Sequence, residues 1–256
     1  MSFDQLRLHS LYSPNPKASI MSQSGKLYLI PTVLSADALF SLPPYITDTV
    51  RQLRIFFVEN ERTARRFLKA LDRSIDIDSL QLLLMNEHNP PDTARAKKLL
   101  QEGHSIGVIS EAGCPAVADP GNLVVQAAHQ VQATVVPMVG PNSMLLALMA
   151  SGMNGQHFQF VGYLPVKPLD RAKAIKDLET TSAKKQQTQL FIEAPYRNNQ
   201  LLKDILQNTN DRTLLCVAVD LTAPTEFIRT QTIAQWKKDT SDFHKRPAIF
   251  LLFAGQ

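Results

Sequence analysis

The stretch IGVISEAGCPAVADPG, residues 106–121, joins four apolar residues to a loop of small residues, glycine and proline. The apolar run Ile106–Ile109 is typical of a buried strand, and the residues after Gly121 have helical spacing. Ala112 and Gly113 allow a ligand to approach the backbone closely, while the prolines fix the direction of the loop. The stretch therefore predicts a strand-to-helix corner that meets a ligand, with a rigid structural connector as the alternative.

The same order of a short apolar strand and a longer helix repeats on both sides of this corner. Strands are predicted at residues 26–30, 55–58, 82–85, 106–109 and 134–137. This alternation is typical of βαβ units in a parallel sheet whose two faces are covered. Ligands of such sheets bind beyond the carboxyl ends of the strands, so the candidate site lies in the loops after Ile30, Val58, Ile109 and Pro137.

The pattern changes after Gly155, where some neighbouring strands have no helix between them. Leu214–Val219 and Thr225–Thr230 are close enough in sequence to form a hairpin, which favours antiparallel pairing. We therefore predict an α/β protein with a mostly parallel first domain and a mixed α+β second domain. The predicted division is a flexible N-terminal extension, 1–25, an N-terminal α/β domain, 26–140, and a C-terminal mixed domain, 141–256.

The composition of the 256-residue chain is that of a globular protein, with 44% hydrophobic and 20% charged residues. Two distant cysteines, Cys114 and Cys216, and scattered histidines give no ligand spacing for a metal site. The first 25 residues lack the apolar core of a signal peptide, and no run approaches the ~18 apolar residues of a membrane span. We expect a cytoplasmic protein with no metal and no membrane partner.

The charge is unevenly divided along the chain, whose formal net charge is +4. Residues 26–139 contain 11 basic and 12 acidic residues, whereas residues 140–256 contain 14 basic and 10 acidic ones. The basic excess near Lys167 and Arg171 is compatible with a surface that contacts phosphates, and a solvated helix face is the plainer alternative. The dinucleotide fingerprint G-x-G-x-x-G and the P-loop signature do not occur, which argues against NAD-dependent dehydrogenases and P-loop ATPases.

Further short motifs follow the predicted strands, in the same order in which one family carries them. They are LYLIPT (27–32), VENERTAR (58–65), EHN (87–89), GPNS (140–143), GYLPVK (162–167), FIEAPYR (191–197) and AVDLTAPTEF (218–227). Together with the corner at residues 110–121, they resemble the tetrapyrrole methylase superfamily of S-adenosylmethionine-dependent methyltransferases. Within it, the chain is most similar to the bacterial ribose 2′-O-methyltransferases of small-subunit ribosomal RNA, from about Lys26 to Phe253.

The resemblance implies a two-domain protein, usually a homodimer, that binds S-adenosylmethionine in the cleft between its domains, largely through backbone groups. Position by position, it implies cofactor contacts at Pro31, Ser110, Glu111, Ala112, Gly113, Pro115, Pro141, Asn142, Ser143, Leu164, Pro195, Tyr196 and Leu221. It also places His88, Lys167 and Arg197 on the substrate side. Ribosomal RNA, or the small ribosomal subunit, is the implied partner.

Several positions depart from the family pattern. The loop PTVLSAD, residues 31–37, lacks the glycine of the family, so a Cβ occupies space that was open. Asn60 replaces one of two neighbouring acids, and Ala223 replaces a lysine. Glu111 and Cys114 replace an aspartate and a threonine. These changes are compatible with a retained cofactor pocket, but they leave the methyl acceptor open.

Methyl transfer to a ribose hydroxyl gains from a carboxylate that accepts the proton, typically by about 10²–10⁴-fold. The candidates for this base are Glu59, Glu193 and Glu226, each at a strand end or in a matched motif. A helix cap or an ion pair with an arginine is the alternative role for each of them. Two other functions stay open at this point: methylation of a tetrapyrrole or another small molecule, and a catalytically inactive paralogue that binds the cofactor or the ribosome.

Overall fold

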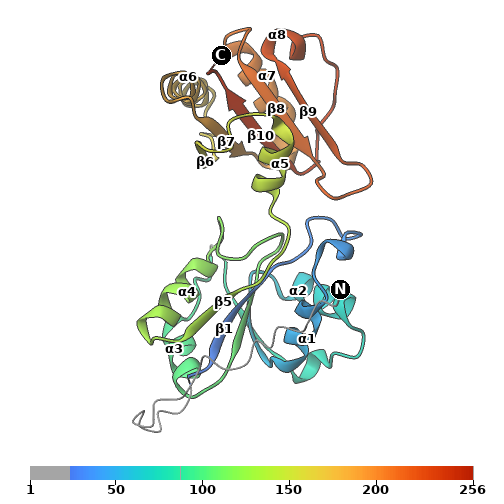
Figure 1. The fold of residues 1–256 in the computed structure, drawn as a ribbon, viewed down its shortest axis with the longest axis vertical. Helices are drawn as coiled ribbons and strands as arrows, with labels where there is room; N and C mark the ends of the chain where they lie inside the picture. The colour runs from blue at the N-terminus through green and yellow to red at the C-terminus, as the bar shows by residue number, and fades with distance from the viewer. Residues whose placement is uncertain (1–23, 87, 256) are drawn as a thin grey trace, which may run out of the picture.

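The computed structural model describes residues 24–86 and 88–255. The predicted extension, residues 1–25, lies almost wholly outside the described residues. The chain forms two five-stranded sheets with their helices, one above the other in Figure 1. We call the part around the first sheet the N-lobe and the part around the second sheet the C-lobe. The boundary at residue 140 stays a prediction.

The N-lobe sheet has the order β3-β2-β4-β1-β5, and all of its neighbouring strands are parallel. Its strands are β1 (Lys26–Ile30), β2 (Ile55–Val58), β3 (Gln81–Leu84), β4 (Ile106–Ile109) and β5 (Thr134–Pro137). Every residue of β2 and β4 is buried, because helices cover both faces of the sheet. Ile109 stands opposite both Ile30 and Val58, so these strands end at one edge. The predicted parallel sheet is confirmed.

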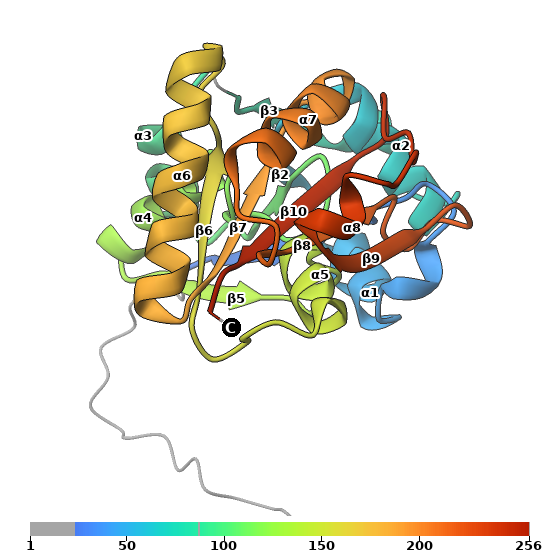
Figure 2. The same cartoon turned by 90° about the horizontal axis from the view of Figure 1, so that it is seen from above.

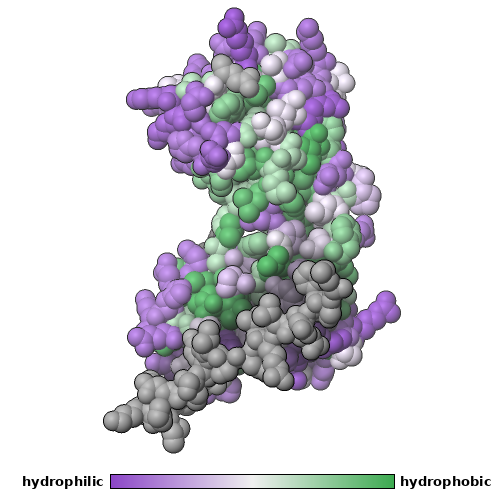
Figure 3. Space-filling model, in the orientation of Figure 1, coloured by the Kyte–Doolittle hydropathy of each residue, from purple (hydrophilic) through white to green (hydrophobic). Residues whose placement is uncertain are grey.

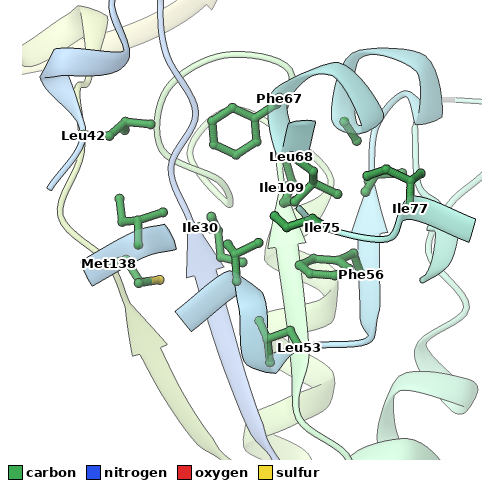
Figure 4. Close-up of a cluster of buried hydrophobic side chains, with 14 residues drawn as sticks. Ile30, Leu42, Leu53, Phe56, Phe67, Leu68, Ile75, Ile77, Ile109 and Met138 are labelled. Carbon is green, nitrogen blue, oxygen red and sulfur yellow. The ribbon is translucent and has the colours of Figure 1, made fainter. Parts of the chain in front are cut away.

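Two layers of helices cover the N-lobe sheet. They are α1 (Tyr45–Gln52), α2 (Glu61–Leu71), α3 (Thr93–Gln101) and α4 (Gly121–Gln130), with short 3₁₀ turns η1 (Leu39–Ser41) and η2 (Ile77–Ser79). On the α2 side, Phe67 and Leu68 belong to one buried cluster with Ile30, Phe56 and Ile109 (Figure 4). The side chains of α3 and α4 form a separate cluster on the opposite face. Burial of these apolar surfaces fixes the sheet and therefore the edge that carries its loops.

The C-lobe sheet has the order β6-β7-β10-β8-β9, in which β6 and β7 are parallel and the other neighbours are antiparallel. Its strands are β6 (Phe158–Tyr163), β7 (Thr188–Ile192), β8 (Leu214–Val219), β9 (Phe227–Thr232) and β10 (Ala248–Phe253). The predicted mixed architecture and the hairpin are therefore confirmed, with β9 starting two residues later than the sequence indicates.

Helices also cover the two faces of the C-lobe sheet. They are α5 (Ser143–Ser151), α6 (Pro168–Lys185), α7 (Asn198–Asn208) and α8 (Ile233–Trp236), with the 3₁₀ turn η3 (Pro195–Arg197). The apolar side of α5 packs on one face, while α6, α7 and α8 belong to a cluster on the other face (Figure 2). Among the described residues, no helix combines the length and the apolar character that crossing a bilayer requires.

Several strands of the C-lobe sheet end on the same side of the sheet, which we call the C-lobe edge. Val219, the last residue of β8, stands opposite Ala248, the first residue of β10. Ile249 stands opposite Ile192 at the end of β7, and Tyr163 at the end of β6 is the parallel neighbour of Ile192. The segments that follow β6, β7 and β8 therefore leave the sheet at the edge where β10 begins.

Candidate active site

Three loops of the N-lobe meet at the carboxyl ends of β1, β4 and β5, and backbone groups tie them together. The Thr32 N–H donates to the Gly113 carbonyl oxygen at 2.9 Å. The thiol of Cys114 donates weakly to the Pro141 carbonyl oxygen, with 3.5 Å between sulfur and oxygen. The Ser110 hydroxyl donates to the same Gly113 carbonyl at 3.3 Å. The loop at residues 110–121 is thus the middle member of a three-loop edge.

Two glycines allow these loops to approach one another. Gly113 has a φ of +75°, a conformation that residues with a Cβ rarely adopt, and a Cβ there would lie 3.2 Å from the Pro141 oxygen. A Cβ on Gly140 would lie 2.2 Å from the Cβ of Pro31, so any side chain there would force the two loops to shift. The loops after β1 and β5 therefore touch only because residue 140 has no side chain.

A cavity of about 290 Å³, which we call the inter-lobe cavity, lies between this edge and the C-lobe. Its N-lobe lining is Leu34, Ser35 and Ala112, and Ser143, the first residue of α5, also borders it. Its C-lobe lining is Ala218, Asp220, Leu221, Ala223, Pro247, Ala248 and Ile249. The volume is close to the lower end of the range of about 300–1,000 Å³ that ligand pockets show, and the lining is mostly apolar with few polar groups. In Figure 3, hydrophobic residues gather at this waist between the lobes.

A second cavity of about 290 Å³, which we call the N-lobe cavity, lies beside the first. It is bordered by Thr63, Arg66 and Phe67 of α2 and by residues of the loops after β1 and β4. Leu34 and Ala112 border both cavities, so the two spaces are direct neighbours. The arrangement offers two adjacent binding spaces that have Leu34 and Ala112 in common.

The residues assigned to the cofactor by resemblance are distributed over this region in different ways. Ala112, Ser143 and Leu221 line the inter-lobe cavity, while Ser110 and Glu111 line the N-lobe cavity together with Ala112. The loops around the two cavities contain Pro31, Gly113, Pro141 and Asn142. Pro115, Leu164, Pro195 and Tyr196 do not appear in the lining of either cavity. These thirteen assignments stay predictions.

Sequence reasoning did not single out several residues of the lining. Leu34 and Ser35 stand where the family has its glycine-containing loop, and among the described residues none in this loop has a positive φ. The loop therefore needs no glycine for its conformation, and Leu34 borders both cavities. Ala248 begins β10, directly after Pro247 and 27 residues from Leu221. Only the pairing of β10 with β8 brings these two residues to the site.

Glu59 is the candidate base that touches the three-loop edge. Its Oε1 accepts a hydrogen bond from the Glu111 N–H at 2.9 Å. Burial raises the pKa of Glu59; the Glu111 N–H opposes this, and the negative charges of Asp119 and Glu111 add to it. Asn60, where the family has an acid, caps α2 by accepting from the Arg62 N–H at 2.9 Å. A carboxylate with a raised pKa is a stronger proton acceptor than an ordinary glutamate.

The other two candidate bases are engaged in local structure. The Glu193 side chain is buried, and its Oε1 accepts from Arg197 Nε at 2.9 Å and Nη2 at 2.6 Å. Glu226 is exposed, and its Oε2 accepts from the Thr222 N–H at 2.7 Å in the turn between β8 and β9. The Glu193 contact matches the predicted alternative of an ion pair with an arginine, whereas Glu226, among the described residues, is neither a helix cap nor an ion-pair partner but holds a turn. Glu59 is the candidate beside the loops that line both cavities.

The predicted substrate-side residues lie around the site rather than in the two cavities. His88 is exposed after the edge strand β3, where its N–H donates to Asn86 Oδ1 at 3.0 Å. Lys167 is exposed immediately before α6, and Arg197 is half-buried beside Glu193. Their assignment to a substrate stays a prediction.

The pentapeptide GHSIG at residues 103–107 fits the G-x-S-x-G pattern of hydrolase nucleophiles, but its position does not. In those enzymes the serine follows a strand and is exposed on a sharp turn before a helix. Ser105 instead precedes β4, and its Oγ accepts a hydrogen bond from the Lys26 N–H at 3.1 Å. It lies at the opposite end of the sheet from the cavities, which excludes it from this site.

No cluster of three or more metal-ligating side chains occurs among residues 24–86 and 88–255. Cys114 and Cys216 are free thiols, and burial raises the pKa of each. Such thiols are poor nucleophiles at neutral pH, because the reactive thiolate is disfavoured.

The fold is shared with solved methyltransferases. The chain superposes on the methyltransferase CobJ with a TM-score of 0.60 and 16% identity, covering 90% of this chain and 94% of CobJ. It superposes on uroporphyrin-III-C-methyltransferase from Thermus thermophilus with a TM-score of 0.52 and on diphthine synthase with 0.61, at 18% and 11% identity. Each of these two superpositions covers 90% of this chain, together with 94% of the Thermus thermophilus protein and 90% of diphthine synthase. The architecture is that of the tetrapyrrole methylase class.

Sequence comparison identifies the family within this class. Ribosomal RNA small subunit methyltransferase I of Xylella fastidiosa is 30% identical over 236 residues, which are 91% of this chain and 82% of that protein. The Vibrio cholerae protein of the same name is 30% identical over 90% of this chain and 77% of its own. The Micromonospora olivasterospora protein is 34% identical over 74% of this chain, but the match spans 57% of its own length. No family model matches the chain.

The chain belongs to the ribosomal RNA small subunit methyltransferase I family. The predicted membership of the tetrapyrrole methylase superfamily is therefore confirmed, and so is the expectation of an S-adenosylmethionine-dependent methyltransferase. The inter-lobe cavity lies where the resemblance places the cofactor, between the two lobes.

Proposed function

We propose that this protein transfers a methyl group from S-adenosylmethionine to a ribose 2′-hydroxyl of small-subunit ribosomal RNA. The observation that supports this most is the contact between the two cavities across Leu34 and Ala112. A methyl transfer needs a donor and an acceptor held in line in neighbouring spaces that exclude water. The names of the relatives support ribosomal RNA as the acceptor.

The inter-lobe cavity fits the donor. Four of its lining residues are alanines, which leave the space open: Ala112, Ala218, Ala223 and Ala248. Asp220 and Ser143 add polar groups at its border, and Asp220 is oriented by Arg246 Nε at 2.8 Å. When bound, S-adenosylmethionine supplies a methyl group already activated on a sulfonium. The protein therefore has to hold the donor and the acceptor and orient them, and it does not have to activate the methyl group.

The N-lobe cavity suits the acceptor. Arg66 can meet a phosphate, whereas Phe67 and Leu39 offer apolar surface to a base or a sugar. Thr63 and Glu111 supply hydrogen-bonding groups, and the Thr63 hydroxyl lies 3.4 Å from Glu111 Oε1. A cavity with one cation and this mixture of polar and apolar groups fits a nucleotide better than a polycarboxylated porphyrin, which would call for several cations.

Glu59 is our candidate for the group that accepts the proton of the 2′-hydroxyl. It lies next to Glu111, which borders the acceptor cavity, and burial keeps its pKa above that of an exposed glutamate. Removal of the hydroxyl proton as the oxygen attacks makes a weak nucleophile competent. The alternative role of Glu59 is to position the loop through the Glu111 N–H.

Labelled S-adenosylmethionine and purified small ribosomal subunits that lack the modification test the function. We expect label to enter the RNA, and digestion to nucleosides followed by mass spectrometry to yield a 2′-O-methylnucleoside. A methylated base would contradict the ribose assignment. Methylation of a porphyrin but not of RNA, or binding without turnover, would establish one of the two alternative functions instead.

Calorimetry with S-adenosylhomocysteine tests the donor site independently of the acceptor. Ala223→Phe should fill the inter-lobe cavity and abolish the binding heat. Ala183→Phe, on the exposed surface of α6, adds the same volume elsewhere and should leave the heat unchanged. Equal binding by both variants would place the donor outside this cavity.

The resemblance also implies a homodimer, and the cysteine content and N-terminal sequence favour a cytoplasmic location; we propose both. Light scattering coupled to size-exclusion chromatography measures the mass of the particle in solution. A mass close to that of one 28.5 kDa chain over the micromolar range would contradict the dimer.

A further inference from the structure

Two tyrosine side chains are strongly exposed near the inter-lobe cavity. Tyr163 is 63% exposed at the end of β6, and Tyr196 is 60% exposed in η3, which follows β7. Tyr163 is the neighbour of Ile192 in the sheet register, and η3 follows Ile192 by two residues, so both tyrosines lie at the end of the C-lobe sheet where β10 begins. The same edge supplies Ala248 and Leu221 to the inter-lobe cavity.

The guanidinium of Arg197 is held in a fixed position beside these rings. It lies 5.1 Å from the centroid of the Tyr196 ring, and Nη1 donates to the Tyr196 hydroxyl at 3.0 Å. Its Nε and Nη2 donate to Glu193 Oε1. The Glu193 side chain is 1% exposed, whereas the Arg197 side chain is 29% exposed. The hydrogen bonds that Arg197 donates to Glu193 are the main cause that raises the pKa of Arg197, and burial opposes them.

Positive charge flanks the two rings. Lys167 is exposed four residues after Tyr163. Lys245 is exposed on the other side, and its N–H donates to the Pro195 carbonyl oxygen at 2.9 Å, next to Tyr196. A protein–protein interface is usually depleted of lysine, whereas a strand of nucleic acid needs cations along its phosphates. The surroundings of the rings therefore favour a polyanionic occupant.

We infer that Tyr163, Tyr196 and Arg197 form a platform on which unpaired bases of the substrate RNA, next to the methylated nucleotide, stack. Exposed aromatic rings and guanidinium planes are the surfaces that bind splayed-out RNA bases, while lysines follow the backbone. The inference rests on the proposed RNA substrate and deepens it. It gives Tyr196 a role on the RNA rather than on the cofactor, and it gives Glu193 the role of a positioning residue for Arg197.

The platform predicts a specific loss of RNA affinity. A short fluorescein-labelled single-stranded RNA is titrated with the full chain in the presence of S-adenosylhomocysteine, and anisotropy is measured. Tyr163→Ala and Tyr196→Ala should each weaken binding by about ten-fold, the effect of one lost base stack. Tyr196→Phe keeps the ring and should bind as the wild type does. The same RNA annealed to its complement should bind equally to all variants, because its bases are not free to stack.

Phe158→Ala is the matched control, since Phe158 is 41% exposed at the start of β6, at the opposite end of the strand. It should leave RNA affinity unchanged. The midpoint of thermal unfolding and the binding of S-adenosylhomocysteine should be the same for all these variants.

Three results would overturn the inference. Unchanged single-stranded RNA affinity of both alanine variants would exclude stacking. A loss of S-adenosylhomocysteine binding by Tyr196→Ala would return this residue to the cofactor. A shift from dimer to monomer would show that the rings contact a second copy of the chain. If the wild-type protein methylates small subunits while the platform variants behave like it, only the platform fails; if the wild type neither binds nor methylates RNA, the proposed function fails first.

Discussion

The two edges that face each other across the inter-lobe cavity are built by different means. The N-lobe edge is held by backbone contacts, as between Thr32 and Gly113, and by the close approach of Pro31 to Gly140. Small residues and main-chain hydrogen bonds leave a narrow, apolar surface of fixed shape.

The C-lobe edge is held by charged side chains. Glu193 fixes Arg197 after β7, and Arg246 fixes Asp220 after β8, with 2.8 Å between Arg246 Nε and Asp220 Oδ2. The two edges therefore differ in the kind of surface that they present to a ligand. The backbone edge gives both cavities a wall of constant shape, while the oriented arginines and exposed rings at the C-lobe edge suit a variable polyanion next to the inter-lobe cavity.

The largest expected effect concerns chemistry at the backbone edge. Glu59→Gln keeps an oxygen that accepts the Glu111 N–H but removes the basic group, so turnover should fall by about 10²-fold or more, with cofactor affinity unchanged. In the wild type, turnover should fall as pH drops through the raised pKa of Glu59, at a higher pH than for an exposed glutamate. Methyl incorporation measured against pH tests both points.

Glu59→Ala is the companion variant, because it also removes the hydrogen-bond acceptor. If Glu59→Gln keeps full turnover and only Glu59→Ala loses it, Glu59 positions the loop and does not accept the proton. That result would place the chemistry elsewhere and weaken the contrast between the two edges.

The second effect concerns the charged edge. Glu193→Ala leaves the Arg197 guanidinium without its main partner at a site where the carboxylate is almost fully buried. Breaking a buried pair costs about 3–5 kcal/mol, and partial exposure of Arg197 reduces this to about 2–3 kcal/mol. Chemical denaturation should show this loss of unfolding free energy. Glu226→Ala, whose side chain is exposed, should cost less than about 1 kcal/mol, and equal losses would refute the distinction.

The third effect tests the close approach in the backbone edge. Gly140→Ala should destabilise the protein by about 1–3 kcal/mol and weaken cofactor binding, because the new Cβ forces the loops after β1 and β5 apart. Gly155→Ala is the matched control, since its Cβ would meet no atom within 4 Å. Differential scanning calorimetry and ligand titration separate the two variants. A neutral Gly140→Ala would show that this edge is plastic.

The smallest effect concerns the cations beside the charged edge. Lys167→Ala should lower RNA affinity equally for all sequences and reduce the slope of log K against log salt by about 0.7, the contribution of one phosphate on a single strand. Tyr196→Ala should weaken binding without changing this slope. A titration at several salt concentrations checks both, and an unchanged slope for Lys167→Ala would remove that lysine from the RNA path.

Much of the N-lobe could be predicted from the sequence, because its signals are local. Runs such as Ile55–Val58 and Ile106–Ile109 are apolar throughout, as expected for strands buried on both faces. The glycine and alanines after Ile109 likewise indicate a ligand loop by their small size. Motif order then indicated the family, which sequence comparison shows.

The identity of the base could not be narrowed in this way. In the sequence alone, nothing ranks Glu59, Glu193 and Glu226 as proton acceptors, because each is a glutamate at a strand end or in a matched motif. They differ because one meets an N–H 52 residues away, one is enclosed by an arginine, and one lies in an exposed turn. Burial and partners outside the motif set the properties of a carboxylate, and a sequence does not display them.

By itself, the sequence determined the order of strands and helices, the parallel character of the first sheet and the position of the loops that border the cavities, because periodicity and residue size act over a few neighbours. Only the tertiary structure decided that Leu34 borders two cavities and that Tyr163 and Tyr196 lie at the same end of the C-lobe sheet as Ala248. These are contacts between segments far apart in the chain. Strand register fixes them, and register depends on the packing of the whole sheet.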